Sequence, residues 1–125
     1  MERLTFTLTT SAAGAASESK TPYESGFLHS IDYTPSAATI TSAATLTVTG
    51  QITGKTMLTW AAAGGATIQQ KSPRIPTHDV DGAASLFAAG GEPVEDAIAV
   101  FDEGITLTLA GGGASKTGTY HVQIE

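Results

Sequence analysis

Large apolar residues alternate with threonine and other polar residues at both ends of this chain, and this pattern constrains the fold most. It runs through residues 2–9, 105–109 and 119–124. Apolar residues at every second position place one face of a β-strand in a core and the other in water. The last two runs flank a glycine-rich stretch, residues 110–118. The sequence therefore predicts a C-terminal β-hairpin with a long, mobile loop.

Shorter runs between the two ends predict further strands. Residues 26–33 alternate until Pro35, which cannot donate to a strand ladder. One face of that strand would carry Phe27, His29, Ile31 and Tyr33. The other expected elements are strands at residues 45–50, 57–60, 66–70 and from about Ala97, and one helical turn within residues 83–89. In the strand at 57–60, Leu58 and the single tryptophan, Trp60, are expected to face the core.

These elements predict an all-β protein. About seven to eight short strands, separated by Gly, Pro and Ser, are typical of an antiparallel β-sandwich of the jelly-roll or Ig-like kind. A chain of 125 residues has the size of one domain, so we expect a single sandwich domain over residues 1–125. Residues 10–24 contain few large apolar side chains and are expected to form a flexible linker or arm.

Composition and charge exclude several classes of function. The net charge is −6, which argues against binding to nucleic-acid phosphates. No apolar run is long enough for a membrane span, and no secretory signal opens the sequence, so we expect synthesis in the cytoplasm. The absence of cysteine excludes thiolate metal sites and disulfides. Only 14% of residues are charged, which fits a surface covered by another protein or, equally well, a GC-rich genome.

The titratable residues do not assemble into a catalytic pattern. His78, Asp79 and Asp81 are the nearest approach to a metal site, but a plain Asp-Gly turn is favoured. His29 and His121 are each interpreted as structural histidines. An acidic segment is interpreted as a solvated edge, since no aromatic-lined sugar cleft accompanies it; it consists of Glu92, Glu95, Asp96, Asp102 and Glu103.

The glycine-rich stretch at residues 111–117 is similar to a phosphate-binding loop in composition. However, Lys116 and Thr117 are followed by a strand, so no helix N-terminus is available to receive a phosphate. The sequence therefore predicts no enzyme, no cofactor, no metal and no small-molecule substrate.

Three segments together resemble small structural proteins of tailed bacteriophages, whose genes lie among head and connector genes. They are the GFLHSIDY run at residues 26–33, the loop from Pro73 to Ala84, and the closing GGGASKTGTYHV run at residues 111–122. The resemblance covers roughly residues 25–125. It implies a virion component, most plausibly a capsid decoration (cement) protein on the outside of the head shell.

The resemblance also implies partners, namely the major capsid protein and other copies of this chain. Contacts are expected from residues 1–20 and from the 110–118 loop. The candidate contact residues are Lys20, Gly112, Ser115, Lys116 and Thr117. Deletion of residues 11–20 is then expected to weaken capsid binding without unfolding the core.

Two alternatives stay open. One is a neck or tail ring component, which would be present in few copies per virion. The other is a carbohydrate-binding β-module, which needs exposed aromatic side chains; Tyr23, Tyr33 and Trp60 are the candidates.

Overall fold

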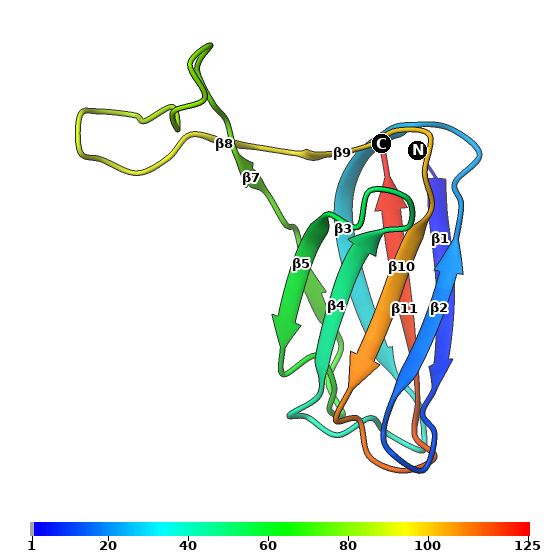
Figure 1. The fold of residues 1–125 in the computed structure, drawn as a ribbon. Coiled ribbons are helices and arrows are strands. Elements are labelled where there is room, and N and C mark those ends of the chain that lie inside the picture. The colour runs from blue at the N-terminus through cyan, green and yellow to red at the C-terminus, as the bar shows by residue number, and fades with distance from the viewer. Residues whose placement is uncertain (1) are drawn as a thin grey trace.

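A computed structural model of the protein describes residues 2–125 and contains two antiparallel β-sheets packed face to face (Figure 1). Strands account for 52% of the structure, and the described residues contain no helix, so none that could cross a membrane. The prediction of an all-β antiparallel sandwich is confirmed. The strands are β1 (Glu2–Thr9), β2 (Ala16–Lys20), β3 (Gly26–Pro35), β4 (Thr45–Gly50), β5 (Thr56–Ala61), β6 (Gln69–Lys71), β7 (Ile75–Pro76), β8 (Glu95–Asp96), β9 (Ile98–Val100), β10 (Ile105–Ala110) and β11 (Thr117–Ile124).

The sheet order leaves edge strands at both sides of the sandwich. The first sheet runs β1-β11-β3-β6, with β9 also pairing with β3, and the second runs β2-β10-β4-β5. Edges β1 and β2 lie on one side, and β5, β6 and β9 lie on the other (Figure 1). A separate two-stranded ladder, β7-β8, stands away from both sheets.

The core lies between the sheets and is built from the alternating apolar residues. Phe6, Leu107 and Val122 are fully buried, and burying each such side chain contributes about 1.5–3 kcal/mol. Trp60 packs edge-on against Tyr120, with ring centroids 6.2 Å apart. The hydroxyl of Tyr120 donates to the carbonyl of Ala63 at 2.7 Å, which satisfies the phenol inside the core.

The predicted C-terminal hairpin is wrong, although both of its strands exist. β10 pairs with β2 and β4 in one sheet, while β11 pairs with β1 and β3 in the other. Residues 111–116 therefore cross from one sheet to the other. Period-two alternation specifies which face of a strand is buried but not which strand lies beside it, because both sheets bury the same kind of face.

The connection at residues 111–116 is also held in place by hydrogen bonds. The hydroxyl of Thr10 donates to the carbonyl of Gly113 at 2.5 Å and accepts from the N–H of Lys116 at 2.7 Å. The N–H of Gly112 donates to the carbonyl of Gly14, and the carbonyl of Gly112 accepts from Thr41. These bonds join three loops at one end of the sandwich.

The prediction that residues 10–24 form a flexible arm is wrong for their central part. Ala16–Lys20 form β2, which pairs with β10 from Leu109 to Ile105. The segment has no large apolar residue because it is an edge strand, and its partly buried side chains, Ala16, Glu18 and Lys20, cover only the rim of the core. Ala16 packs against the core from this position.

The prediction of which β3 side chains face the core is wrong at the start of the strand. Ser30 pairs with Gln123 and Leu28 pairs with Ile124, so His29 is an extra residue in a β-bulge. The bulge reverses the alternation: Leu28 is buried and Phe27 is half exposed, whereas Ile31 and Tyr33 face the core as expected.

Most of the remaining predictions place strands close to where they occur. Residues 45–50 and 57–60 correspond to β4 and β5, where Trp60 is buried and Leu58 packs against the core. The expected strand at 66–70 lies slightly later, as β6, and that from Ala97 is β9. The helical turn at residues 83–89 does not form. The described residues contain eleven strands, more than expected, because short pieces occur between Gln69 and Val100.

Candidate interaction surface

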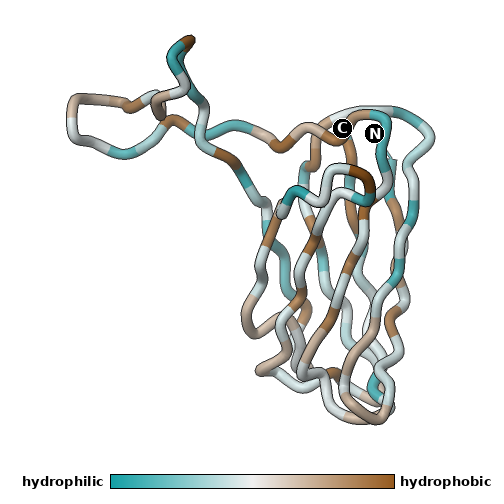
Figure 2. Tube along the Cα trace, viewed as in Figure 1, coloured by the Kyte–Doolittle hydropathy of each residue, from teal (hydrophilic) through white to brown (hydrophobic). Residues whose placement is uncertain are grey.

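Residues 72–97 leave the sandwich as an extended arm (Figures 1 and 2). β6 pairs with Ile31–Tyr33 and β9 pairs with Gly26–Leu28, in the same direction along β3. The two strands are thus separate pieces of one interrupted edge strand. The arm is the segment of chain between these two pieces. Both of its ends are therefore held by pairing with β3.

The arm is ordered by its own backbone hydrogen bonds. The N–H of Thr77 donates to the carbonyl of Val94 at 2.8 Å, and the N–H of Ser85 donates to the carbonyl of Thr77 at 2.9 Å. β7 and β8 form a short ladder at its base, between Ile75–Pro76 and Glu95–Asp96. Two turns form its tips, one at residues 79–83 and one at residues 87–92, as two loops in Figure 1.

The large apolar side chains of the arm are not packed into a core. Val80 and Phe87, at the two tips, are 102% and 77% exposed, and Ile75 and Leu86 are also exposed. Apolar segments are visible along the arm in Figure 2. Exposed apolar side chains gathered on one projection mark an interaction surface more strongly than scattered ones do.

The arm is also strongly acidic. It contains five carboxylates and one arginine, so it carries four of the six net negative charges of the chain. The charged residues are Arg74, Asp79, Asp81, Glu92, Glu95 and Asp96. A surface that is both apolar and acidic fits a partner that combines an apolar recess with positive charge.

The base of the arm is anchored to the sandwich by two contacts. The rings of Phe27 and Phe101 meet edge to face with centroids 5.6 Å apart, and both remain about half exposed. The ammonium group of Lys55 donates to the carbonyl of Ala99 in β9 at 2.5 Å. These contacts join the residues just after the arm to β3 of one sheet and to the β4–β5 turn of the other.

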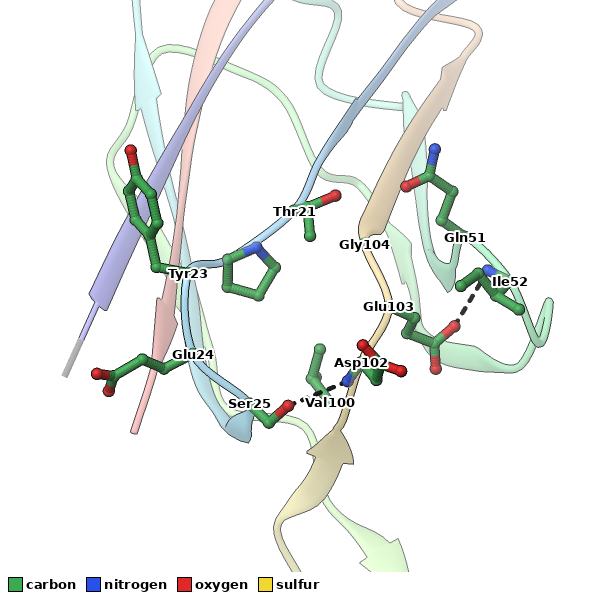
Figure 3. Close-up of a pocket in the computed structure, with 11 residues that line it drawn as sticks. Thr21, Tyr23, Glu24, Ser25, Gln51, Ile52, Val100, Asp102, Glu103 and Gly104 are labelled. Atoms are coloured by element: carbon green, nitrogen blue, oxygen red, sulfur yellow. Dashed lines mark hydrogen bonds between the residues drawn. The ribbon is translucent and has the colours of Figure 1, made fainter.

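Glu103 lies beside this base and is nearly fully buried, with 5% of its surface exposed. Its carboxylate accepts from the N–H of Ile52 at 3.2 Å (Figure 3). It also accepts from the N–H of Thr53 at 3.1 Å and lies 3.8 Å from the ammonium of Lys55. The hydrogen bond from the Thr53 N–H is the largest influence that lowers the pKa of Glu103. A side chain at Gly50 would collide with this carboxylate.

The prediction that Glu103 belongs to a solvated acidic edge is therefore wrong. Its neighbour Asp102 is exposed, with its N–H bonded to the hydroxyl of Ser25 at 3.0 Å. Both residues line a cleft of about 190 Å³ between the β2–β3 loop and residues 100–104 (Figure 3). The sequence shows only adjacent carboxylates, and the difference between them arises from the turn at residues 51–55, which closes over Glu103 alone.

The structure separates the predicted contact residues into two groups. Lys20 pairs with Ile105 near the end of the sandwich that carries both termini, whereas Gly112, Ser115, Lys116 and Thr117 lie at the opposite end. Gly112 is buried, and Ser115 is exposed. The role of these five residues as partner contacts stays a prediction.

The three histidines lie on separate parts of the molecule. His29 lies 3.2 Å from a carboxylate oxygen of Glu125, and His121 lies 3.2 Å from the hydroxyl of Thr5. His78 is on the arm, beside Asp79, whose carboxylate accepts from the N–H groups of Asp81 and Ala83 and forms the turn. Within residues 2–125 no three His, Asp or Glu side chains converge in a way that could hold a metal ion.

The candidate sugar-binding aromatics differ in exposure. Tyr33 and Trp60 lie in the core, whereas the side chain of Tyr23 is 99% exposed. Burial of Trp60 agrees with its expected place in the core, and the carbohydrate-binding alternative keeps only Tyr23 of its three candidates on the surface. The alternating sequence pattern cannot distinguish an aromatic residue in the core from one that binds a ligand at the surface, because either can lie on one face of a strand.

The arm is the candidate interaction feature that sequence reasoning missed. Its signals are present in the sequence: Pro73, Pro76 and Pro93 interrupt strand patterns, and apolar residues occur there without period two. Such a segment is also typical of an ordinary surface loop. Only the pairing of β6 and β9 with one strand shows that it projects.

Comparison of the chain with protein-family models, with curated proteins and with solved structures gave no match. The functional proposal therefore depends on the geometry described above and on the sequence resemblance.

Proposed function

We propose that this chain is a structural protein of a bacteriophage virion, with decoration of the outside of the head shell as its role. The observation that carries the proposal is the arm, which presents Val80, Leu86 and Phe87 to solvent on a projection from a closed sandwich. Burial of these side chains against a partner would be favourable by roughly 25 cal/mol per Å² of apolar surface. The resemblance of residues 26–33 and 111–122 to phage structural proteins indicates the kind of assembly.

Other features support this role. The sandwich is rigidly cross-linked at one end by the Thr10 and Gly112 hydrogen bonds, and its arm is free for contacts at the other end. The net charge of −6 keeps the surface from adhering to packaged or released nucleic acid. Weak contacts repeated over a symmetric shell would combine into firm attachment by avidity.

A ring component of the neck or tail is the second candidate. It is favoured by the placement of the arm, which points sideways from one end of the sandwich (Figure 1) and could reach a neighbour in a ring. The two candidates differ in copy number, because a decoration protein covers a shell and a ring component occupies one axial position.

The test is quantification of the chain in purified virions of a phage that encodes it, by peptide mass spectrometry against the major capsid protein. A ratio near that of the shell subunits supports decoration, and a ratio of a few copies per particle supports the ring. Absence of the chain from the particles would overturn the proposal. A matched experiment adds purified protein to heads that lack it and measures co-sedimentation.

A further inference from the structure

The groove between β1 and β2 is the surface of this chain that best complements the arm. We infer that the arm of one copy docks in this groove of the next copy, which builds a head-to-tail ring. The inference deepens the proposed function, because it names a second copy of this chain as the partner of the arm.

The groove has a volume of about 650 Å³ and lies where the two sheets open at their β1 and β2 edges. Leu4 forms part of its floor, and the exposed ring of Tyr23 stands at its rim. The outer edge of β1 pairs with no strand within residues 2–125, so its backbone groups are open to an added segment, apart from the carbonyl of Thr5, which accepts from Lys20. The groove thus offers the apolar contacts and backbone partners that the arm lacks.

The charges of groove and arm are complementary. Arg3 is exposed in the groove, and no ion pair within the described part of the chain involves it. Lys20 adds a second positive charge, with an ion pair to Glu18 at 3.7 Å and a hydrogen bond to the carbonyl of Thr5. Glu2 is the one acidic side chain of the groove; it accepts from the N–H of Tyr23 at 2.9 Å and keeps its charge, so the lining residues Glu2, Arg3 and Lys20 sum to a net charge of +1. An arm with a net charge of −4 would be attracted to this site.

The placement of the two surfaces determines the symmetry. The arm leaves from the β6 and β9 side, and the groove lies on the β1 and β2 side, near the same end of the sandwich (Figure 1). Each copy therefore presents an arm on one side and an acceptor on the other. Contacts between different patches are heterologous, and they produce a closed ring when the rotation between neighbours closes.

Direct pairing of two arms is less favourable than this arrangement. Each arm carries a net charge of −4, so two arms in contact would repel one another. The effect of salt separates the two modes. Screening weakens the attraction between arm and groove, whereas it relieves the repulsion between two arms and would strengthen their association.

The experiment measures the association of the purified full-length protein by sedimentation velocity and native mass spectrometry, from low to high salt. The arm variant is Phe87→Ser, with Ile68→Ser as its control, because Ile68 is also exposed, at 70%, but lies off the arm. The groove variant combines Arg3→Glu with Tyr23→Ser, and its charge control is Lys116→Glu at the other end of the sandwich. Thermal melts verify that each variant is folded.

The expected result is association of the wild type that weakens with salt. Each of the two interface variants should weaken it by roughly 30-fold or more, the loss typical of removing an anchor residue at an interface, while both controls leave it unchanged. A mixture of the arm variant and the groove variant should form a one-to-one heterodimer, because the intact groove of one receives the intact arm of the other. Neither variant alone should form this dimer with itself.

Three outcomes would overturn the inference: a monomeric wild type at all concentrations, association that strengthens with salt, or disruption by Lys116→Glu but not by Arg3→Glu with Tyr23→Ser. A monomer whose Phe87→Ser variant no longer binds phage heads would show that the arm contacts the shell, and the proposed function would stand. If the purified protein forms the ring but virions contain no copies of it, the proposed function is wrong and the inference about the arm and the groove stands.

Discussion

The carboxylate of Glu103 connects segments that are distant in the sequence. It accepts hydrogen bonds from the backbone N–H groups of Ile52 and Thr53. The nearby Lys55 ammonium also donates to the carbonyl of Ala99 at the base of the arm. A buried carboxylate with this many donors is held in its charged form. Its charge therefore affects both the stability of the sandwich and the anchoring of the arm.

Replacement of Glu103 by glutamine is expected to reduce stability at neutral pH and to change its pH dependence. The pKa of Glu103 in the folded protein lies below its ordinary value of 4.5. The stabilisation by the carboxylate is therefore complete above about pH 4.5 and is lost as the pH falls through the lower pKa of the folded state. The difference between wild type and Glu103→Gln should shrink on acidification.

Urea unfolding of both proteins between about pH 3 and pH 7 measures this difference. The control is Glu24→Gln, which changes an exposed carboxylate at the rim of the same cleft and should leave stability nearly unaltered. A wild-type-to-variant difference that is constant over the whole pH range would contradict the assignment.

Thr10 has a comparable role at the other end of the sandwich. Its hydroxyl both donates to the Gly113 carbonyl and accepts from the Lys116 N–H, and the residue is 4% exposed. Thr10→Val should cost about 1 kcal/mol of unfolding free energy, because it leaves two partly buried backbone groups, the Gly113 carbonyl and the Lys116 N–H, without this partner. Chemical denaturation measures the cost, and Thr7→Val, on the exposed face of β1, should stay within about 0.5 kcal/mol of wild type. Equal effects at both positions would argue against the bonds described.

At the scale of elements, the composition of β2 suggests a dispensable linker, whereas the structure shows a strand of the sandwich. Its residues are small or polar, yet it pairs along its length with β10, and its last residue, Lys20, lines the groove. It also carries the chain from the end of the sandwich where Thr9 pairs with Thr117 to the end where Lys20 pairs with Ile105.

Deletion of residues 11–20 should therefore unfold the protein, contrary to the expectation from the sequence. The shortened chain would have to join Thr10 directly to Thr21 across the length of β2, roughly 17 Å at about 3.3 Å per strand residue. Circular dichroism and thermal melting measure the outcome. A truncated protein that retains a cooperative transition close to that of wild type would restore the view of this segment as a dispensable arm.

At the scale of the whole molecule, the sandwich and the arm differ in what holds them together. The two sheets are held together by one apolar core, which includes Leu107, Val122 and Trp60. The arm has backbone hydrogen bonds of its own, but its large apolar side chains are exposed. Segments with few buried contacts open more readily than core strands do.

Hydrogen exchange should reveal this difference. At low concentration, amides within residues 72–97 should exchange on the order of 100-fold or more faster than those of β10, because the arm opens without disrupting the core. At concentrations where the wild type associates, the arm and β1 should become protected together, and the Phe87→Ser variant should not show this gain. Protection of the arm at all concentrations would indicate that it is stable by itself.

The amino-acid sequence alone determined the fold class and most strand positions, because period-two alternation records which side chains are buried and needs no knowledge of neighbours. Alternation within residues 2–9, 45–50 and 105–109 places Leu4, Leu46 and Leu107 on the core face, and they are buried. The tertiary structure decided everything that depends on which strands become neighbours: the separation of β10 from β11, the bulge at His29, the burial of Glu103, and the arm that interrupts the edge beside β3. The reason is physical, since alternation constrains one face of each strand locally, whereas strand pairing and loop closure are settled by contacts between residues far apart in the chain.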